Sequence, residues 1–143
     1  MSRVSERVSV REATVPELPD VLNVLDGAAL AVDTGRLRSA IDRGEVLVAV
    51  AGGNSDRERP PDSEQSTEGR IVGALVLEGR EITAVAVRRR RRDQGIGTAL
   101  VEAATRRRDR LLAEFDAGVR PFWESLGFAV EQAAEQGRFR GRR

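Results

Sequence analysis

The chain has 143 residues, of which 33% are charged and 40% hydrophobic, and its formal net charge is +1. It contains no cysteine and no histidine, and neither tyrosine nor lysine occurs in it. Disulfides, cysteine or histidine metal sites, a cysteine nucleophile and a Ser-His-Asp triad are therefore excluded, and acid–base chemistry is left to carboxylates, water or backbone groups.

A chain of this length is expected to form one domain over 1–143. No apolar run approaches the roughly 20 residues that a membrane-spanning helix needs. The N-terminal segment is too polar for a secretory signal, so a cytoplasmic location is expected.

The predicted elements begin with a half-buried strand, because Val8 and Val10 alternate with polar neighbours. Thr14 and Glu17 then have the spacing of a capping box, in which a glutamate reaches back to the backbone at a helix start. The helix that follows has one apolar face, formed by Leu18, Val21, Leu22 and Leu25.

The middle of the chain is predicted to alternate between helix, strand and loop. A second helix is expected over 34–43, and the almost continuously apolar segment 45–51 predicts a strand buried on both faces. Segment 52–69 is rich in Gly, Ser, Pro and acidic residues and is expected to be a mobile loop. A strand over 71–77 then turns at 78–80 into a hairpin.

The second strand of this hairpin leads through a basic turn into a helix. Residues 81–87 are strand formers, and 88–94 are mostly arginine. The helix begins near Gly95, with apolar residues at helical spacing, namely Ile96, Ala99, Leu100 and Ala103.

The last third of the chain is expected to add a strand over 111–115, a helix over 119–126 and strands over 128–130 and 138–141. The predicted order of elements is thus β-α-α-β-β-β-α-β-α-β-β. No internal repeat is present.

The junction between the basic turn and its helix has the features of a phosphate site. Gly95 and Gly97 carry no Cβ, so backbone N–H groups at the helix start are open to a bulky anion. The positive end of the helix dipole favours such an anion by about 0.3–1 kcal/mol. Thr98 adds a hydroxyl, and Arg92 adds a forked cation suited to phosphate. No third glycine follows, which separates the pattern from the dinucleotide-binding fingerprint.

Two segments together resemble one known family. Arg92-Asp93-Gln94-Gly95-Ile96-Gly97 follows an R/Q-x-x-G-x-G/A pattern, and Pro121-Phe122-Trp123-Glu124-Ser125-Leu126-Gly127-Phe128 is similar to an F-Y-E-K-L-G-F segment. Both occur in this order in the GCN5-related N-acetyltransferases, the GNAT superfamily, and with the order of elements the resemblance covers essentially the whole chain. It implies an α/β (α+β) GNAT fold, with a mixed central sheet of six to seven strands flanked by about four helices.

The resemblance also implies acetyl-CoA as cosubstrate, with no metal. In the family, the pyrophosphate lies on the glycine-rich loop, and N–H groups of the splayed central strand bind the pantetheine and the acetyl group. For the strand positions, the alternative is a purely structural place in the core. The residues that match as cofactor contacts are Val85, Ala86, Val87, Arg92, Asp93, Gln94, Gly95, Ile96, Gly97, Thr98, Asp116 and Trp123.

Glu81 precedes Arg92 by eleven positions, the offset at which the histone-acetyltransferase branch of the family places its general base. Removing the proton from a lysine-type amine at neutral pH costs roughly 4–5 kcal/mol, against about 1 kcal/mol for an α-amine. A base would therefore matter most for a lysine-type acceptor. The alternative is a solvated glutamate at a strand end, beside Arg80.

Two positions depart from the family pattern. Trp123 stands where a tyrosine commonly protonates the leaving thiolate, and an indole cannot supply that proton. Asp116 stands where an asparagine often contacts the cofactor, and an ionised carboxylate cannot donate. Both favour a non-catalytic acetyl-CoA-binding regulatory module. Glu81 favours an enzyme, and this is the main interpretation of the sequence. The enzyme would be an N-acetyltransferase in which a primary amine of a small molecule or protein attacks acetyl-CoA directly in a ternary complex.

Arginines over 88–92 and 106–110 are expected to form a positive zone around the phosphate loop. Most side chains over 88–91 are assigned to a solvated face. A third interpretation, an arginine-rich nucleic-acid binder, is disfavoured by the near-neutral net charge and the 3% content of aromatic residues. The acceptor amine is not apparent from the sequence, and a homodimer stays open because GNAT proteins are often dimers.

Overall fold

A computed structural model describes residues 8–27, 33–52, 70–92, 94–133 and 137–143. The loop predicted over 52–69 lies outside the described residues, apart from Gly52. Within the described ranges, no helix combines the length and the apolar character needed to cross a membrane.

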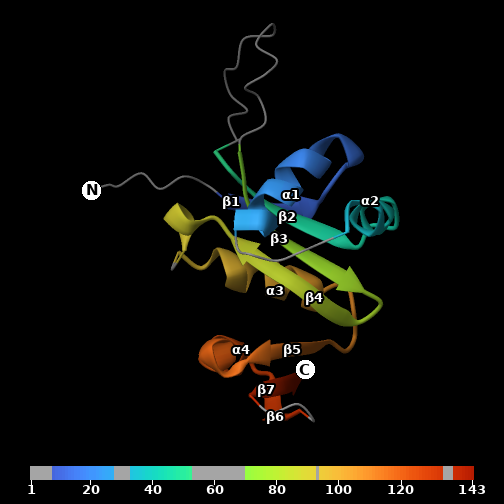
Figure 1. The fold of residues 1–143 in the computed structure, drawn as a ribbon. Coiled ribbons are helices and arrows are strands. Elements are labelled where there is room, and N and C mark those ends of the chain that lie inside the picture. Colours follow the sequence, from blue (N-terminus) through green and yellow to red (C-terminus); the bar gives the residue numbers. More distant parts are fainter. Residues whose placement is uncertain (1–7, 28–32, 53–69, 93, 134–136) are drawn as a thin grey trace, which may run out of the picture.

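A seven-stranded mixed sheet, ordered β1-β2-β3-β4-β5-β7-β6, runs through the molecule (Figure 1). Neighbouring strands are antiparallel, except that β4 and β5 are parallel. The predicted order of elements and the strand number are confirmed. The strands are β1 (Val8–Glu12), β2 (Val46–Ala51), β3 (Arg70–Glu78), β4 (Glu81–Val87), β5 (Leu112–Asp116), β6 (Ala129–Gln132) and β7 (Arg138–Arg142).

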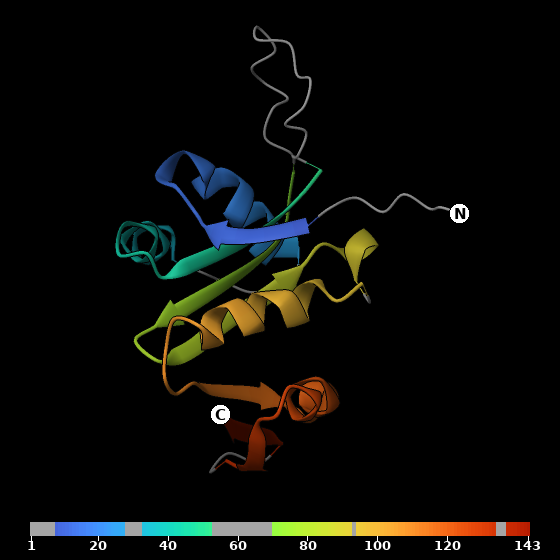
Figure 2. The same ribbon diagram turned by 180° about the vertical axis from the view of Figure 1, so that it is seen from behind.

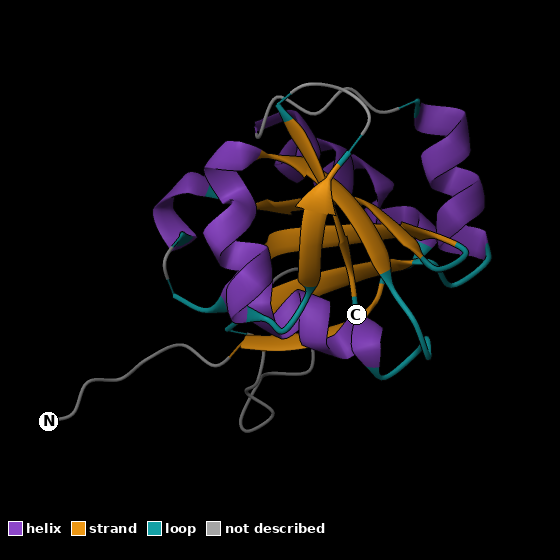
Figure 3. Ribbon diagram, turned by 90° about the horizontal axis from the view of Figure 1, so that it is seen from below, coloured by secondary structure: helices purple, strands orange, loops and turns teal. Residues whose placement is uncertain are grey.

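Helices cover both faces of the sheet, as Figure 2 and Figure 3 show from two directions. On one face α1 and α2 pack, and on the other α3 packs. Strand β2 alternates accordingly, since Leu47 and Ala49 point towards α3 while Val46 and Val48 point towards α1 and α2. The predicted burial of this strand on both faces is confirmed. The α-helices of the described residues are α1 (Leu18–Gly27), α2 (Thr34–Asp42), α3 (Ile96–Thr105) and α4 (Arg120–Ser125).

The chain enters α1 through a short 3-10 turn, η1 (Val15–Glu17), which is closed by the predicted capping box. The Glu17 carboxylate accepts the Thr14 N–H at 2.9 Å, and Arg11 donates to both carboxylate oxygens at 2.9 and 2.6 Å. The hydrogen-bonded guanidinium of Arg11 lowers the pKa of Glu17 to about 2. This contact ties β1 to the entry of the first helix.

Replacing Glu17 with glutamine is expected to lower the free energy of unfolding by about 1–2 kcal/mol at neutral pH. Because the folded-state pKa is depressed, the carboxylate stabilises the protein fully above its ordinary pKa of 4.5, and this contribution is lost as the pH falls through about 2. Denaturant unfolding at several pH values should show wild type and variant converging in acid. A difference that does not change with pH would contradict the assignment.

The matched control is Glu124→Gln, which breaks an exposed i,i+4 pair with Arg120. Exposed pairs of this kind contribute about 0.3–0.5 kcal/mol, so this variant should change the free energy of unfolding by no more than that.

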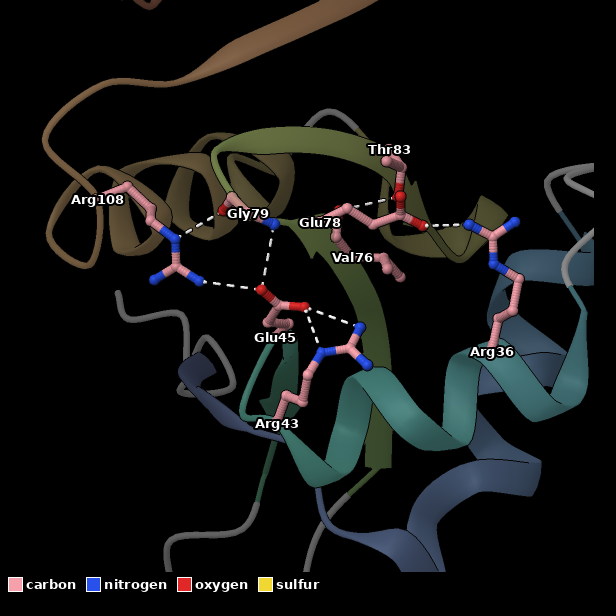
Figure 4. A network of polar contacts seen from close by, with 8 residues as sticks. All are labelled: Arg36, Arg43, Glu45, Val76, Glu78, Gly79, Thr83 and Arg108. Atoms are coloured by element: carbon pink, nitrogen blue, oxygen red, sulfur yellow. Dashed lines mark hydrogen bonds and ion pairs between the residues drawn. The ribbon is translucent and has the colours of Figure 1, made fainter.

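A polar network fixes the β3–β4 hairpin at one end of the sheet (Figure 4). The Glu45 carboxylate accepts hydrogen bonds from Arg43 Nε at 3.0 Å, the Gly79 N–H at 3.1 Å and Arg108 Nη2 at 3.4 Å. Arg108 Nε also donates to the Gly79 carbonyl at 2.7 Å. Burial alone would raise the pKa of Glu45, but the Gly79 hydrogen bond and the two guanidinium groups outweigh it and lower the pKa. The hairpin turn is thus held from β2 and from the chain after α3.

These contacts correct one expectation about charge. Arg108 follows the C-terminal end of α3, whereas the glycine-rich turn precedes its N-terminal end, so a helix of 10 residues separates them, a length of about 15 Å. Arg107 pairs with Glu12 at 3.7 Å, away from that turn. The prediction that arginines over 106–110 belong to the positive zone around the phosphate loop is therefore wrong, because a helix holds its two ends apart.

Candidate active site

A bulge in β4 precedes its separation from β5. Two adjacent residues of β3 face Ile82 and Ala84, so Thr83 between them is an extra residue in β4. Parallel pairing with β5 involves only Glu81 and Ile82, the first residues of β4. Beyond the bulge the two strands diverge, and one edge of β4 is left without a neighbouring strand (Figure 2).

This open edge of β4 carries backbone donors. The Arg88 N–H donates to β3 at 2.8 Å, and the N–H groups of successive strand residues point to opposite sides. Alternation therefore turns the N–H groups of Val85 and Val87 to the open edge. Ala86 faces the other way, with its N–H towards β3 and its side chain buried against the core under α1 and α2. Arg92 Nε donates to the Val87 carbonyl at 3.2 Å.

The start of α3 lies beside this edge. Its N-cap, Gly95, has a φ of 84°, in the left-handed region that favours glycine, and the first N–H groups of a helix have no partner within it. A Cβ on Gly97 would stand 3.4 Å from the Phe122 ring and 3.9 Å from Val87. Because Gly97 has no side chain, the backbone of the first turn of α3 is not covered at this position.

Close packing on β3 sets the position of α3. A Cβ on Gly73 would stand 3.0 Å from the Ile96 side chain and 3.1 Å from that of Leu100, and both side chains are buried. Because Gly73 lacks that atom, the helix approaches the sheet closely. Its first turn is thereby fixed relative to β4.

The aromatic side chain predicted to contact the cofactor is part of the core. Trp123 is buried, stacks on Phe115 with a centroid distance of 5.4 Å, and meets Phe122 and Phe128 edge-on at 5.1 and 5.0 Å. Phe122, rather than Trp123, is the aromatic residue whose ring lies against Gly97.

The other residues predicted to contact the cofactor differ in how exposed they are and in where they lie. Gln94 is exposed in the turn before α3, Thr98 is half-buried in its first turn, and Ile96 is buried in the core. Asp116 ends β5, away from this turn in sequence, and Asp93 lies outside the described residues. Among the residues that the structure describes, no cluster of three or more acidic side chains is arranged to hold a metal ion.

Glu81 is exposed at the paired end of β4, before the bulge. A groove of about 190 Å³ lies between α2 and β4, and Asp33, Glu78 and Thr83 contribute to its lining. Glu78 is the cross-strand partner of Glu81 and accepts a hydrogen bond from Arg36 at 3.1 Å (Figure 4). Neither groove carboxylate was predicted from the sequence. The available signals were the position of Asp33 before a helix and that of Glu78 next to the hairpin turn.

The fold and this site define the class of protein, because a mixed sheet whose central parallel pair opens beside a glycine-rich helix start is the GNAT fold. Residues 61–130 match the family described as "Acetyltransferase (GNAT) domain". The chain thus has the fold of the GCN5-related N-acetyltransferase superfamily and carries a sequence match to that family over residues 61–130. Among curated proteins, none matches the sequence.

Solved structures of this fold align over nearly the whole chain. A GNAT-family acetyltransferase from Bacillus cereus has a TM-score of 0.68 at 12% identity, covering 95% of this chain and 94% of its own. The PaiA N-acetyltransferase from Thermoplasma acidophilum, in complex with coenzyme A, has a TM-score of 0.68 at 13% identity, with coverages of 96% and 98%. NAA60 from Arabidopsis thaliana, in complex with a bisubstrate analogue, has a TM-score of 0.67 at 13% identity, with coverages of 95% and 98%. At these identities the likeness establishes the fold.

Proposed function

We propose that this chain transfers an acetyl group from acetyl-CoA to a primary amine. The observation that carries the proposal is the open edge of β4, where the N–H groups of Val85 and Val87 point away from β3 beside the start of α3. The similar structures that contain coenzyme A or a bisubstrate analogue support it.

The chain's own backbone would hold the cosubstrate. The N–H groups at the start of α3, with Arg92, Gln94 and Gly95, would bind the pyrophosphate, since helix N-termini favour such anions. Acetyl-CoA supplies an acetyl group activated as a thioester. The N–H of Val85 would polarise the carbonyl oxygen, and preorganised donors of this kind are often the largest contribution to catalysis. Val87, nearer the turn, would bind the pantetheine.

Glu81 is the proposed general base. Val85 lies four positions further along the strand, which corresponds to at most about 13 Å, so the amine proton would reach the carboxylate through water. The amine nitrogen forms the new C–N bond while the C–S bond breaks, and the sulfur leaves as a thiolate. A thiol with a pKa near ~8.5 leaves without a proton donor, so the indole of Trp123 does not prevent the reaction. With no cysteine to carry the acetyl group, transfer is direct within a ternary complex.

The acceptor amine would approach from the α2 side of the sheet. There the groove places the carboxylates of Asp33 and Glu78 near the bulge of β4, and acidic side chains attract an ammonium group over short distances. Arg36, which pairs with Glu78 at 3.1 Å, limits this attraction. The groove therefore suits an amine that carries a polar or anionic group of its own.

A thiol-release assay tests the proposed function. Because the chain contains no cysteine, a thiol reagent reports only the coenzyme A that is set free, and because it contains no lysine, its own side-chain amines do not compete. Incubation with acetyl-CoA and a panel of polyamines, lysine-containing peptides and α-amino peptides should give thiol release that depends on the amine. Mass spectrometry should show one acetyl group added to the acceptor for each coenzyme A that is released.

The second candidate is an acetyl-CoA-binding regulatory module, which the burial of Trp123 in the aromatic cluster favours. Calorimetric titration separates the two. Binding of acetyl-CoA without amine-dependent thiol release across the panel supports the module. No binding of acetyl-CoA or coenzyme A excludes both.

A further inference from the structure

Five arginines line one pocket on the face of the sheet that α1 covers. The pocket has a volume of about 840 Å³ and lies where β3 begins and β4 ends, a size typical of small-molecule sites. Its arginines come from two segments that pair as neighbouring strands, the start of β3 and the turn after β4. They are Arg70, Arg88, Arg89, Arg90 and Arg91.

This arginine pocket is distinct from the pyrophosphate site proposed above. Its lining includes residues of α1 and none from 94–98, the turn and first helical residues of α3. α1 and α3 pack on opposite faces of the sheet. Val87, at the end of β4, also lines the pocket, and Arg91 directly precedes Arg92, so the two sites are neighbours in the turn that follows β4.

The charge of the arginine pocket is strongly one-sided. Among the residues that the structure describes, the lining includes five arginines and one acidic residue, Asp20. Arg88 is fixed at the wall, because its Nε donates to the Ile71 carbonyl at 2.9 Å. Like charges gathered in a concave site raise the local concentration of anions, and the guanidinium fork matches phosphate oxygens in pairs. The site therefore favours a ligand with a phosphate group.

The uncharged part of the lining narrows the class of ligand further. Val24, Ile71 and Val72 supply aliphatic surface, and none of the lining residues within the described ranges is aromatic, so these residues do not offer the stacking on which binding of single-stranded nucleic acid depends. We propose that the arginine pocket binds a small phosphate or diphosphate ester of an aliphatic group, at the same time as acetyl-CoA. This assigns the arginines over 88–91 to a ligand site rather than to a solvated face.

Calorimetric titration of the whole chain with inorganic phosphate, inorganic pyrophosphate and hexyl phosphate tests the proposal. Hexyl phosphate should bind about tenfold more tightly than inorganic phosphate, because part of its chain is buried on the aliphatic lining. Binding should weaken as the salt concentration rises. Saturation with coenzyme A should leave the affinity for hexyl phosphate unchanged within about threefold.

Arg70→Gln should weaken hexyl phosphate binding by about tenfold, because it removes one charged hydrogen-bonding partner. Arg106→Gln, which makes the same change in charge at the far end of α3, should leave binding unchanged. Gly97→Glu, aimed at the pyrophosphate site, should also leave it unchanged, so that a failure of the acetyl-CoA proposal can be told from a failure of this one.

Three results would overturn the proposal. They are equal binding by wild type and Arg70→Gln, loss of hexyl phosphate binding on saturation with coenzyme A, and displacement of hexyl phosphate by a short RNA or DNA oligonucleotide at stoichiometric amounts. Far-ultraviolet circular dichroism and a thermal melt of each variant show whether it is folded, so that only folded proteins are compared.

Discussion

Replacing Gly97 with glutamate is expected to weaken the binding of acetyl-CoA and of coenzyme A by more than about 100-fold, which corresponds to about 2.7 kcal/mol. A Cβ at this position would stand 3.4 Å from the Phe122 ring, and Gly97 lies in the first turn of α3, so a longer side chain starts at the helix start itself. There its carboxylate would occupy the proposed place of the pyrophosphate. The loss combines the repulsion of like charges with blocked access to the N–H groups of the helix start.

The glutamate variant is expected to stay folded. Gly97 lies within α3 and is not among the glycines with positive φ, and an acidic residue in the first turn stabilises a helix by about 0.3–1 kcal/mol. Titration with acetyl-pantetheine, which lacks the pyrophosphate, separates the effects. Wild type and variant should differ for acetyl-CoA and coenzyme A and agree for acetyl-pantetheine.

Gly97→Ala is the matched control for size. Its Cβ would fit at 3.4 Å, an ordinary contact distance, so it should lose less than about tenfold in affinity for coenzyme A. If the glutamate variant binds coenzyme A as tightly as wild type does, the pyrophosphate does not bind at this turn.

The strands and helices could be predicted because each carries its own periodicity. The segment 45–51 is apolar at almost every position, which predicts a strand with both faces buried. In β2, alternate residues indeed belong to the two core clusters on opposite faces of the sheet. In α2, the predicted inward residues Leu37, Ala40 and Ile41 are all buried. Boundaries shift by one or two residues, as for β5, predicted over 111–115 and observed at Leu112–Asp116, because strand ends depend on the neighbouring strand.

Features that depend on distant partners could not be predicted. The bulge at Thr83 is a property of the register between β3 and β4, and nothing in the β4 sequence by itself specifies it. Trp123 occupies a family motif position, yet its burial depends on Phe115 from another element. Arg108 binds Glu45 across a separation of 63 residues. A linear motif locates a turn in the chain, but the surroundings of its side chains come from the sheet.

The candidate site shows the same division. The helix start at Gly95 was predictable, because the two glycines and the apolar face of α3 are local signals. The orientation of the β4 backbone could not be predicted, because it depends on the pairing of β4 with β3 on one side and on the end of its pairing with β5 on the other. The groove carboxylates Asp33 and Glu78 come together only because α2 lies over the β3–β4 hairpin.

Glu81→Gln is expected to slow acetylation of a lysine-type amine by about 100-fold near neutral pH, the lower end of the usual effect of a general base. Glutamine keeps the shape of the side chain and cannot take up a proton. A lysine-type amine is almost fully protonated near neutral pH, whereas an α-amine is protonated much less. The loss should therefore be only a few-fold for an α-amine, and for the lysine-type amine it should shrink as the pH approaches about 10.

The comparison variant is Glu78→Gln, because Glu78 is the cross-strand partner of Glu81 and lies in the groove proposed for the acceptor. It removes the same charge from the same end of the sheet. If Glu81 is the base, Glu81→Gln lowers kcat and changes the pH profile, while Glu78→Gln raises KM for the amine and leaves the profile of kcat unchanged. Equal changes in KM alone for both variants would mean that Glu81 only attracts the amine. A Glu81→Gln protein that keeps its rate and pH profile would instead identify Glu81 as a solvated residue at the strand end.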